Sequence, residues 1–428
     1  MRMNPDKMPA RSTAAKMVSL GFALFLLLLA EVITRLAIPS THLDNILEIL
    51  RRDRDLFWRQ RADLATRFAK VEIRTDGRGF RIGDRAERIP ERKAPGRVRV
   101  VCMGASPTFG WGVPFKDTYS QRLQELLRRD FGLAADVVNA GMIGYSSHQG
   151  VRLLASDILP TQPDLVMVSY VINDIDKYRF FGSDGRPDRD VPIPSAALIG
   201  LQNALDHSRF YRLFQKVFLT SLHRRASFDG RPVEIFRPRS VRVPPDEYRD
   251  NLARLVRLAK AHGAGIVFLV MPVNLPEPPD VPEGDRASTR DLADRGIALA
   301  EAGKYREALE PLSRAVERDP YLSEAHYFLG VCHRRLGESW LAEESFTATM
   351  KSESYRCGAD GLRYNRIMRE AAAELQVPLV DAAAAFRNHP EEYLFNSPME
   401  DPIHPNARGH ALIAHEAAGV VAEALRSR

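Results

Sequence analysis

The chain has 428 residues, of which 45% are hydrophobic and 27% charged, and its formal net charge is +6. This length predicts two or three domains with a sizeable core, and the composition is ordinary for a globular protein. The basic residues form no run of five or six, which argues against nucleic-acid binding and leaves anionic lipid or acidic glycan as partners of the charge. The cysteines are too few and scattered for a disulfide framework, and no Cys/His spacing indicates zinc: Cys102, Cys332 and Cys357.

The N-terminus combines basic residues with a long apolar stretch. Residues 17–30 carry no charge, and the apolar character continues to residue 38, which makes 17–38 long enough to span a bilayer. The residues before Glu31 make a poor cleavage site, so we predict an uncleaved signal anchor over residues 1–38. Four basic residues precede it and favour a cytoplasmic N-terminus and an extracytoplasmic remainder: Arg2, Lys7, Arg11 and Lys16. The alternative is a buried helix of a soluble domain.

Beyond the anchor, charged residues dominate 39–95, and we predict a partly helical, membrane-proximal stalk there. From residue 96 on, strand and helix patterns alternate. Strands are predicted at 97–104, 135–141, 164–171, 264–273 and 377–383, and helices at 117–130, 146–159, 244–263, 361–375 and 406–426. This alternation predicts an α/β fold with a doubly wound, mainly parallel sheet. We assign residues 96–284 and 359–428 to this domain.

Two stretches interrupt the alternation. Residues 175–243 are rich in Arg, Pro and aromatic residues, and we predict a cap-like insertion. Residues 285–358 form a second insertion with an internal repeat over 289–357. Three pairs of small residues keep a 34-residue offset: Gly296 and Gly330, Gly303 and Gly337, and Ala308 and Ala342. This segment resembles a pair of tetratricopeptide repeats, an α-helical hairpin pair that could bind a partner protein. Two unrelated amphipathic hairpins are the alternative.

The stretch MGASPTFGWGV (103–113) has three glycines but no phosphate-binding pattern. Trp111 stands where a P-loop requires Lys, and no G-x-G-x-x-G is present. Ser106 instead follows a predicted strand at the carboxyl edge of the sheet, where open α/β sheets bind their ligands. A serine nucleophile needs a base oriented by a carboxylate, and Asp401 and His404 in DPIHPNARGH provide both.

An oxyanion site is the third requirement for acyl transfer. Gly141 and Asn173 each follow a predicted strand, so each reaches the same edge as Ser106. Simpler structural roles exist for all of these residues: Ser106 as a helix N-cap, Gly141 as a turn and Asn173 as a loop cap. A group of residues in the stretch that follows Gly141 either lines a substrate groove or begins a helix: Tyr145, Ser146, Ser147 and Gln149. A metal site at Asp401, His404 and His410 is the weaker explanation of those side chains.

These blocks resemble the SGNH, or GDSL-type, hydrolase family. The resemblance covers roughly 96–174, 244–273 and 361–428, and rests on Gly104–Ser106, Gly141, Asn173 and the pair Asp401–His404 in the family's order. It implies a flavodoxin-like fold, Ser106 as nucleophile, His404 as base and Asp401 as the residue that orients it. It further implies that the Ser106 amide, the Gly141 amide and Asn173 form the oxyanion hole. Ala105 replaces the family's Asp, which leaves room for a weakened enzyme or a pseudoenzyme.

The resemblance implies a membrane-anchored, extracytoplasmic serine esterase. Its substrate would be an O-acyl ester, in the first place an O-acetyl ester, of a polysaccharide or cell-envelope glycan, with no cofactor and no metal. The alternatives are an O-acetyltransferase on an exopolysaccharide and a non-catalytic, membrane-tethered scaffold that uses its repeats. We also expect the helical insertion beside the active-site mouth, because it follows a predicted strand whose end lies on the catalytic edge.

Overall fold

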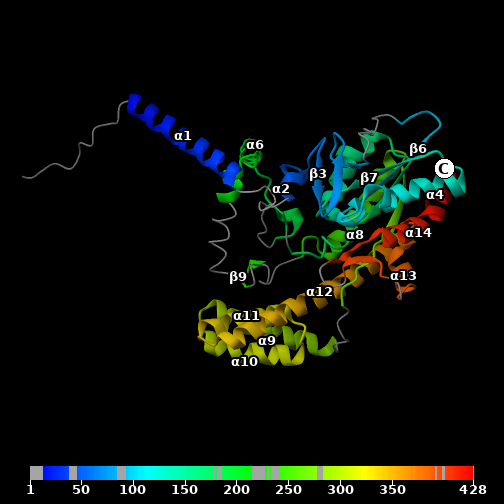
Figure 1. Cartoon of the computed structure of the whole chain (residues 1–428). Coiled ribbons are helices and arrows are strands. Elements are labelled where there is room, and N and C mark those ends of the chain that lie inside the picture. Colours follow the sequence, from blue (N-terminus) through cyan, green and yellow to red (C-terminus); the bar gives the residue numbers. More distant parts are fainter. Residues whose placement is uncertain are drawn as a thin grey trace, which may run out of the picture.

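The computed structural model describes residues 13–37, 46–83, 93–177, 179–180, 186–214, 227–228, 231–232, 241–276, 283–390, 393–397 and 401–427. Its main body is an α/β domain, from which a helical insert and the N-terminal helix α1 (Thr13–Ala37) project (Figure 1). Part of the predicted anchor, including Arg2, Lys7 and Arg11, and much of 175–243 lie outside the described residues.

An eight-stranded sheet forms the centre of the α/β domain. Its strand order is β12 (Leu379–Asp381), β11 (Gly265–Val270), β8 (Leu165–Ser169), β6 (Val98–Gly104), β7 (Ala135–Gly141), β5 (Arg81–Ile82), β4 (Val71–Thr75), β3 (Ala65–Phe68). The strands from β12 to β7 pair in parallel, whereas β5, β4 and β3 extend the sheet with antiparallel pairing. The predicted mainly parallel sheet is confirmed, and all five predicted strands are present.

Helices cover both faces of this sheet, because its central strands are apolar on both sides. In β6, Val101 and Met103 join one core cluster, while Val100 and Cys102 join the other. The first cluster includes α5 (Ser147–Leu153), α8 (Pro245–Ala261) and the end of α12 (Ser339–Glu374). The second includes α4 (Tyr119–Phe131), α13 (Ala382–Arg387) and α14 (Ala407–Arg426). Near the second cluster, β13 (Phe395–Ser397) pairs with β14 (Asp401–Pro405).

The predicted stalk over 39–95 is wrong for its described residues. Besides β3, β4 and β5, this region contains α2 (Ile46–Ile49) and the hairpin of β1 (Leu50–Asp53) and β2 (Phe57–Gln60). Trp58 and Phe80 are fully buried in the first core cluster. The many charged residues hid short strands whose apolar side chains alternate with polar ones. Residues 46–83 are therefore part of the α/β domain.

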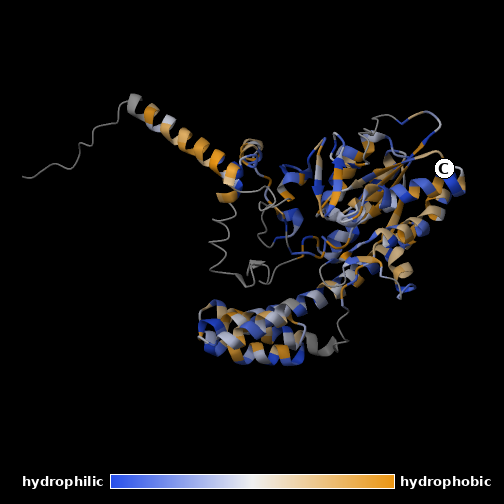
Figure 2. Ribbon diagram, viewed as in Figure 1, coloured by the Kyte–Doolittle hydropathy of each residue, from blue (hydrophilic) through white to orange (hydrophobic). Residues whose placement is uncertain are grey.

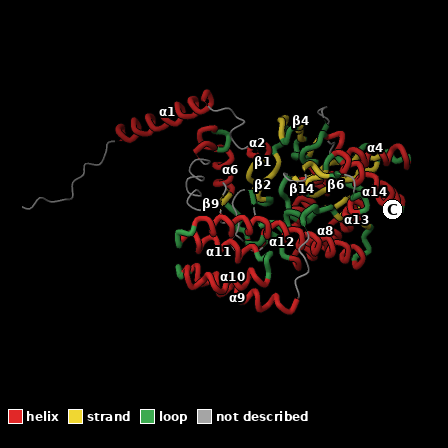
Figure 3. Tube along the Cα trace, turned by 60° about the horizontal axis from the view of Figure 1, so that its bottom comes forward, coloured by secondary structure: helices red, strands yellow, loops and turns green. Residues whose placement is uncertain are grey.

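The helical insert consists of α9 (Glu283–Glu301), α10 (Tyr305–Arg318), α11 (Ser323–Arg335) and the first half of α12, which share a separate core. Its glycines allow close helix packing, since a Cβ at Gly296 would lie 2.5 Å from Leu312 Cγ. Helix α12 continues unbroken from the insert into the α/β domain, so the predicted boundary at residue 358 falls inside a helix (Figures 1 and 3).

The insert contacts the carboxyl edge of the sheet. Lys177 follows closely on the end of β8, and its Nζ lies 3.9 Å from Glu324 of α11 and 3.7 Å from Glu353 of α12. Arg356 of α12 donates to the carbonyl of Ile175 at 3.3 Å. The base of the insert is therefore close to the strand end at which Asn173 was predicted to act.

Helix α1 is apolar along most of its length and almost fully exposed (Figure 2). Its residues Met17–Ala37 are long and apolar enough to cross a membrane, and 6% of the most apolar window is buried. Such a helix near an N-terminus fits either a signal sequence or an anchor. The remaining described elements are α3 (Ser106–Phe109), α6 (Ala196–Leu205), β9 (Ser227–Phe228), β10 (Arg231–Pro232) and short 3-10 or π turns.

Candidate active site

Ser106 lies at the start of α3, directly after the central strand β6. The turn needs glycine before it, because a Cβ at Gly104 would lie 2.2 Å from Thr108 Oγ1 and 2.6 Å from the Ser169 carbonyl. Ala105 is the N-cap residue of α3 and has no side chain to accept a hydrogen bond from the helix. The first N–H groups of α3, including that of Ser106, are therefore not capped by this residue.

A side chain from the antiparallel part of the sheet fixes the C-terminal end of α3. Arg81 of β5 is buried, and its guanidinium donates to the carbonyls of Phe109, Gly110 and Val113 at 2.6–2.7 Å. The region predicted as a stalk thus contributes directly to the position of the serine turn.

Ser106, His404 and Asp401 form a continuous chain of hydrogen bonds. His404 Nε2 lies 2.8 Å from Ser106 Oγ, and His404 Nδ1 lies 2.6 Å from Asp401 Oδ1. Strand β14 carries both the carboxylate and the imidazole, and Asn396 Nδ2 donates to the other Asp401 oxygen at 3.1 Å. The structure therefore brings these three predicted residues together, although Ser106 and His404 are 298 residues apart in the sequence.

The electrostatics of this chain suit proton transfer from serine to histidine. Burial alone would raise the pKa of Asp401, but the hydrogen bond and charge of His404 outweigh it and hold that pKa below its usual value. An ionised carboxylate only accepts hydrogen bonds, so His404 Nδ1 carries the proton and Nε2 is free to accept from Ser106. The Trp111 ring stacks on the imidazole with 5.1 Å between centroids and 10° between planes.

Gly141 and Asn173, the predicted oxyanion donors besides Ser106, already have hydrogen-bond acceptors within the protein. The Gly141 N–H already donates to Asn139 Oδ1 at 3.1 Å, and a Cβ at Gly141 would lie 2.1 Å from the Phe109 nitrogen. Gly141 is therefore a close-packing position behind α3, with its donor occupied. Asn173 Nδ2 donates to the carbonyl of Tyr145 at 3.1 Å, which links the end of β8 to the loop after β7.

Gly144, in the loop after β7, is a further candidate donor that was not singled out from the sequence. It has a φ of +77°, and a Cβ there would lie 2.3 Å from the Phe180 ring. Among the described residues, no acceptor takes its N–H, while its carbonyl is bound by Arg242. The signal in the sequence was the second glycine of NAGMIGYSS, which stands beside the Tyr145 carbonyl that Asn173 contacts.

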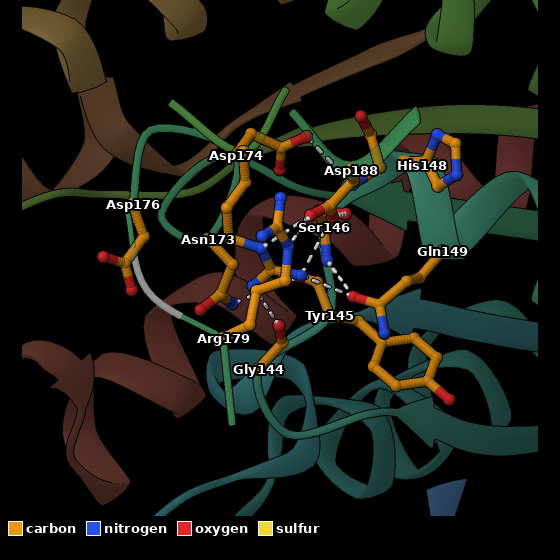
Figure 4. A network of polar contacts seen from close by, with 12 residues as sticks. Gly144, Tyr145, Ser146, His148, Gln149, Asn173, Asp174, Asp176, Arg179 and Asp188 are labelled. Carbon is orange, nitrogen blue, oxygen red and sulfur yellow. Dashed lines mark hydrogen bonds and ion pairs between the residues drawn. The ribbon is translucent and has the colours of Figure 1, made fainter. Parts of the chain in front are cut away.

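A buried polar network supports the Gly144 loop from behind (Figure 4). Arg242 donates to the Gly144 carbonyl at 2.7 Å, to Gln149 Oε1 at 2.6 Å and to Asp188 Oδ2 at 3.0 Å. Asp188 also accepts from Arg179 at 2.6 Å and from the Ser146 hydroxyl at 2.6 Å. The predicted cap-like insertion thus contributes three charged side chains that hold the loop.

Asp188 is ionised in this network. Burial alone would raise its pKa, but the charge and hydrogen bonds of Arg242, together with Arg179 and Ser146, lower it below the usual value. The ion pair is fully enclosed, so removing one partner would leave an uncompensated charge.

Asp174, next to Asn173, has the opposite shift. Its side chain is fully buried, and burial raises its pKa from 3.8 to about 7 although hydrogen bonds from Ser147 favour the charged form. The folded state therefore binds a proton that the unfolded state releases between these two values, and the free energy of unfolding falls as pH rises through this window.

We expect Asp174→Asn to remove this pH dependence, because an amide oxygen can still accept from the Ser147 N–H at the same place. Urea unfolding at several pH values should show the variant gaining on the wild type by on the order of 2 kcal/mol between about pH 5 and pH 8. If the free energy of unfolding changed with pH in the same way for both proteins, Asp174 would not be the buried, neutral carboxyl that we infer.

The residues at the start of α5 support the structural alternative rather than a substrate groove. All are buried, and the Ser146 N–H donates to Gln149 Oε1 at 3.2 Å as part of a helix-capping arrangement: Tyr145, Ser146, Ser147 and Gln149. His410 is also buried; burial lowers its pKa to about 3, and its Nδ1 accepts from the Tyr119 N–H at 3.1 Å. It therefore supports α4 instead of facing Ser106.

Two cavities lie at the carboxyl edge of the sheet. A small one of about 10 Å³ adjoins the serine turn and is lined mostly by apolar residues: Ala105, Pro107, Ser169, Val171, Ile172, Met271, Pro272, Val273 and Ile403. A larger one of about 340 Å³ lies between the end of β11, α13 and the strand β13, with Arg387, His389 and Tyr393 on its wall.

Comparisons with known proteins agree with the fold class. Residues 102–306 match the family described as GDSL-like Lipase/Acylhydrolase, a match that ends before Asp401 and His404. A search of curated proteins finds no match.

Solved structures give distant likenesses. LAE5, an α/β hydrolase enzyme from the metagenome of Lake Arreo in Spain, is 16% identical over 77% of this chain and 96% of that chain, with a TM-score of 0.36. Axe2, an acetylxylan esterase from Geobacillus stearothermophilus, is 15% identical over 77% and 96%, also with a TM-score of 0.36. The acetyl xylan esterase AlAXEase is 13% identical over 76% and 100%, with a TM-score of 0.37. These likenesses are too distant to assign a substrate. Residues 102–306 are therefore similar to the GDSL-like lipases and acylhydrolases, and the chain is an ester hydrolase.

Proposed function

We propose that the protein is a membrane-anchored serine esterase that removes short acyl groups, in the first place acetyl groups, from a glycan outside the cytoplasm. The observation that carries the catalytic part is the hydrogen-bond chain from Ser106 through His404 to Asp401. Ester hydrolysis needs a serine whose proton has an acceptor in reach, and this chain provides one.

In the proposed mechanism, Ser106 Oγ attacks the ester carbonyl carbon while His404 Nε2 takes its proton. Asp401 stabilises the imidazolium that forms. The tetrahedral intermediate collapses, the C–O bond to the sugar breaks, and His404 returns the proton to the leaving alkoxide. Water then attacks the acyl-serine with His404 again as base, which releases the carboxylic acid and restores Ser106.

The oxyanion of that intermediate needs preorganised donors. We assign this role to the Ser106 amide, Asn173 and the Gly144 amide, and we place Gly144 ahead of Gly141 because the Gly141 N–H is occupied by Asn139. The Asn173 side chain contacts the Gly144 loop, because its Nδ2 donates to the Tyr145 carbonyl.

The size of the cavity beside the serine turn supports a short acyl group. A volume of about 10 Å³ corresponds to roughly one water-sized sphere, close to the size of a methyl group, so the cavity favours a short acyl chain over a longer one. Its apolar wall, with Val171, Met271 and Ile403, suits an acetyl methyl. Because Ala105 also lines this cavity, the residue that departs from the family pattern helps to set its chemistry.

Helix α1 supports the membrane anchor, and the proposed orientation follows from the basic residues before it in the sequence. The glycine-mediated packing and 34-residue offset of the insert support a tetratricopeptide-like pair that binds a protein partner beside the active site.

A serine-reactive fluorophosphonate probe and a series of p-nitrophenyl esters test the proposal. We expect the probe to label the protein at Ser106, and acetate to be turned over at least about tenfold faster than hexanoate, because a longer chain does not fit. A scaffold would neither label nor turn over ester. Labelling without release of acid, but with transfer of acetyl to an added sugar, would identify a transferase instead.

A further inference from the structure

The end of α1 is fixed to residues 208–210 of the α/β domain. The Glu31 carboxylate accepts from the Ser208 hydroxyl at 2.7 Å and from the backbone N–H groups of Arg209 and Phe210 at 3.0 and 2.9 Å. Arg35, one turn further along α1, pairs with the same carboxylate at 2.6 Å. This contact fixes the position of residues 208–210 along the axis of α1.

If α1 spans a bilayer, residues 208–210 lie at the membrane interface. At about 1.5 Å per residue, Met17–Ala37 is about 32 Å long, close to the ~30 Å of a hydrocarbon core. Glu31 then lies in the last two turns of this span, near the interface, and residues 208–210 lie at the same level. Helix α6 precedes them directly in the chain, and it is drawn beside the end of α1 in both views (Figures 1 and 3).

Helix α6 buries one apolar side chain, Ile199, but exposes its leucines. Polar residues at its C-terminal end face the protein: Asn203 exchanges two hydrogen bonds of 2.9 Å with the backbone of Arg52 in β1, and the C-cap residue Asp206 forms an ion pair with the Arg52 side chain. Its leucines face outward, with Leu198 46% and Leu201 57% exposed.

An outward apolar face on a surface helix is unfavourable in water, because the apolar side normally packs on the core. Further exposed apolar side chains lie at the end of α6, in the segments that flank it and at the end of α1: Leu205, Ile193, Phe214, Val32, Ile33 and Leu36. The end of α1 and residues 208–210, which follow α6, are joined through Glu31. A bilayer surface is the one occupant that explains them together with α1.

We propose that α6 lies in the interface of the bilayer that α1 enters, with Leu198, Leu201 and Leu205 among the lipid headgroups and upper acyl chains. The domain is then held to the membrane at two places, through α1 and through α6, so that it cannot rotate freely about a single tether. This proposal rests on the membrane anchor proposed above.

The test uses the full chain, reconstituted into vesicles of phosphatidylcholine and phosphatidylglycerol. Cys102 and Cys332 are buried, so a Cys357→Ser background leaves an introduced cysteine as the site for an environment-sensitive NBD label. Leu201→Cys and Leu205→Cys report on α6. Leu341→Cys, on the insert, is the matched control because its exposure of 37% equals that of Leu205.

We expect lipids with a nitroxide near the headgroup to quench the labels on α6 by about twofold or more, and the label at position 341 to be unaffected. Equal, weak quenching at all three positions would overturn the proposal. A blue shift without lipid quenching would also overturn it and identify a protein contact. Flotation of the chain with the vesicles reports on membrane attachment as a whole. A chain that does not float has no anchor, whereas a chain that floats without quenching of the α6 labels has an anchor but no α6 contact.

Discussion

Replacing Ser106 with alanine is expected to lower kcat for p-nitrophenyl acetate by about a thousandfold or more, because the attacking oxygen is lost while the rest of the site remains. The hydroxyl contacts His404 and lies in a turn defined by backbone contacts, so the melting temperature should change little. Steady-state kinetics and a thermal melt on the same preparation provide the measurement.

The control for this change is Ser156→Ala, an exposed serine whose hydroxyl contacts the neighbouring Asp157. It should keep wild-type turnover. If Ser106→Ala retains full activity while Ser156→Ala behaves as expected, Ser106 is not the nucleophile and the mechanism is wrong.

Removing the charge at Arg242 is expected to have the largest effect on stability. The guanidinium is buried against Asp188, and Arg242→Met would leave that carboxylate with Arg179 as its one remaining ion-pair partner among the described residues. Breaking such a buried pair costs about 3–5 kcal/mol. Urea unfolding should show a loss of this order.

The same change should lower kcat more than it raises KM, because Arg242 also holds the Gly144 carbonyl and thereby the proposed oxyanion donor. Kinetics must be measured at a temperature where the variant is folded. The matched control is Arg189→Met, whose side chain is 48% exposed in the same insertion and whose ion pairs are 3.7 Å or longer. That variant should change stability by less than about 0.5 kcal/mol. Equal effects of the two changes would mean that the buried network has no special role.

Which features the sequence predicted depended on how local their signals are. The continuous apolar runs of β6, β8 and β11 indicated buried parallel strands without further information. Ser106 was found because it follows a predicted strand, and Asp401 and His404 because they stand three residues apart in DPIHPNARGH. The fold brings the three side chains within hydrogen-bond distance.

The missed features depend on contacts between distant segments. The strands β3, β4 and β5 have only two to five residues each, too short for a period to stand out among charged side chains. No role for Arg242 or Asp188 was predicted, because nothing in the local sequence shows that they meet next to Gly144. The sequence could not show that the Gly141 N–H already has an acceptor, because that acceptor is the side chain of a buried Asn139.

The unbroken helix α12 has a consequence for how this protein is built. Its first half completes the core of the insert, and its second half packs on α8, where Tyr364 donates to the Val243 carbonyl at 2.6 Å. Two segments that share one continuous helix form and lose its hydrogen bonds cooperatively. The insert and the α/β domain therefore behave as a single folding unit and not as two independently folding domains. The insert therefore has no flexible hinge at this junction. A partner that binds the insert is thereby also held to the hydrolase domain.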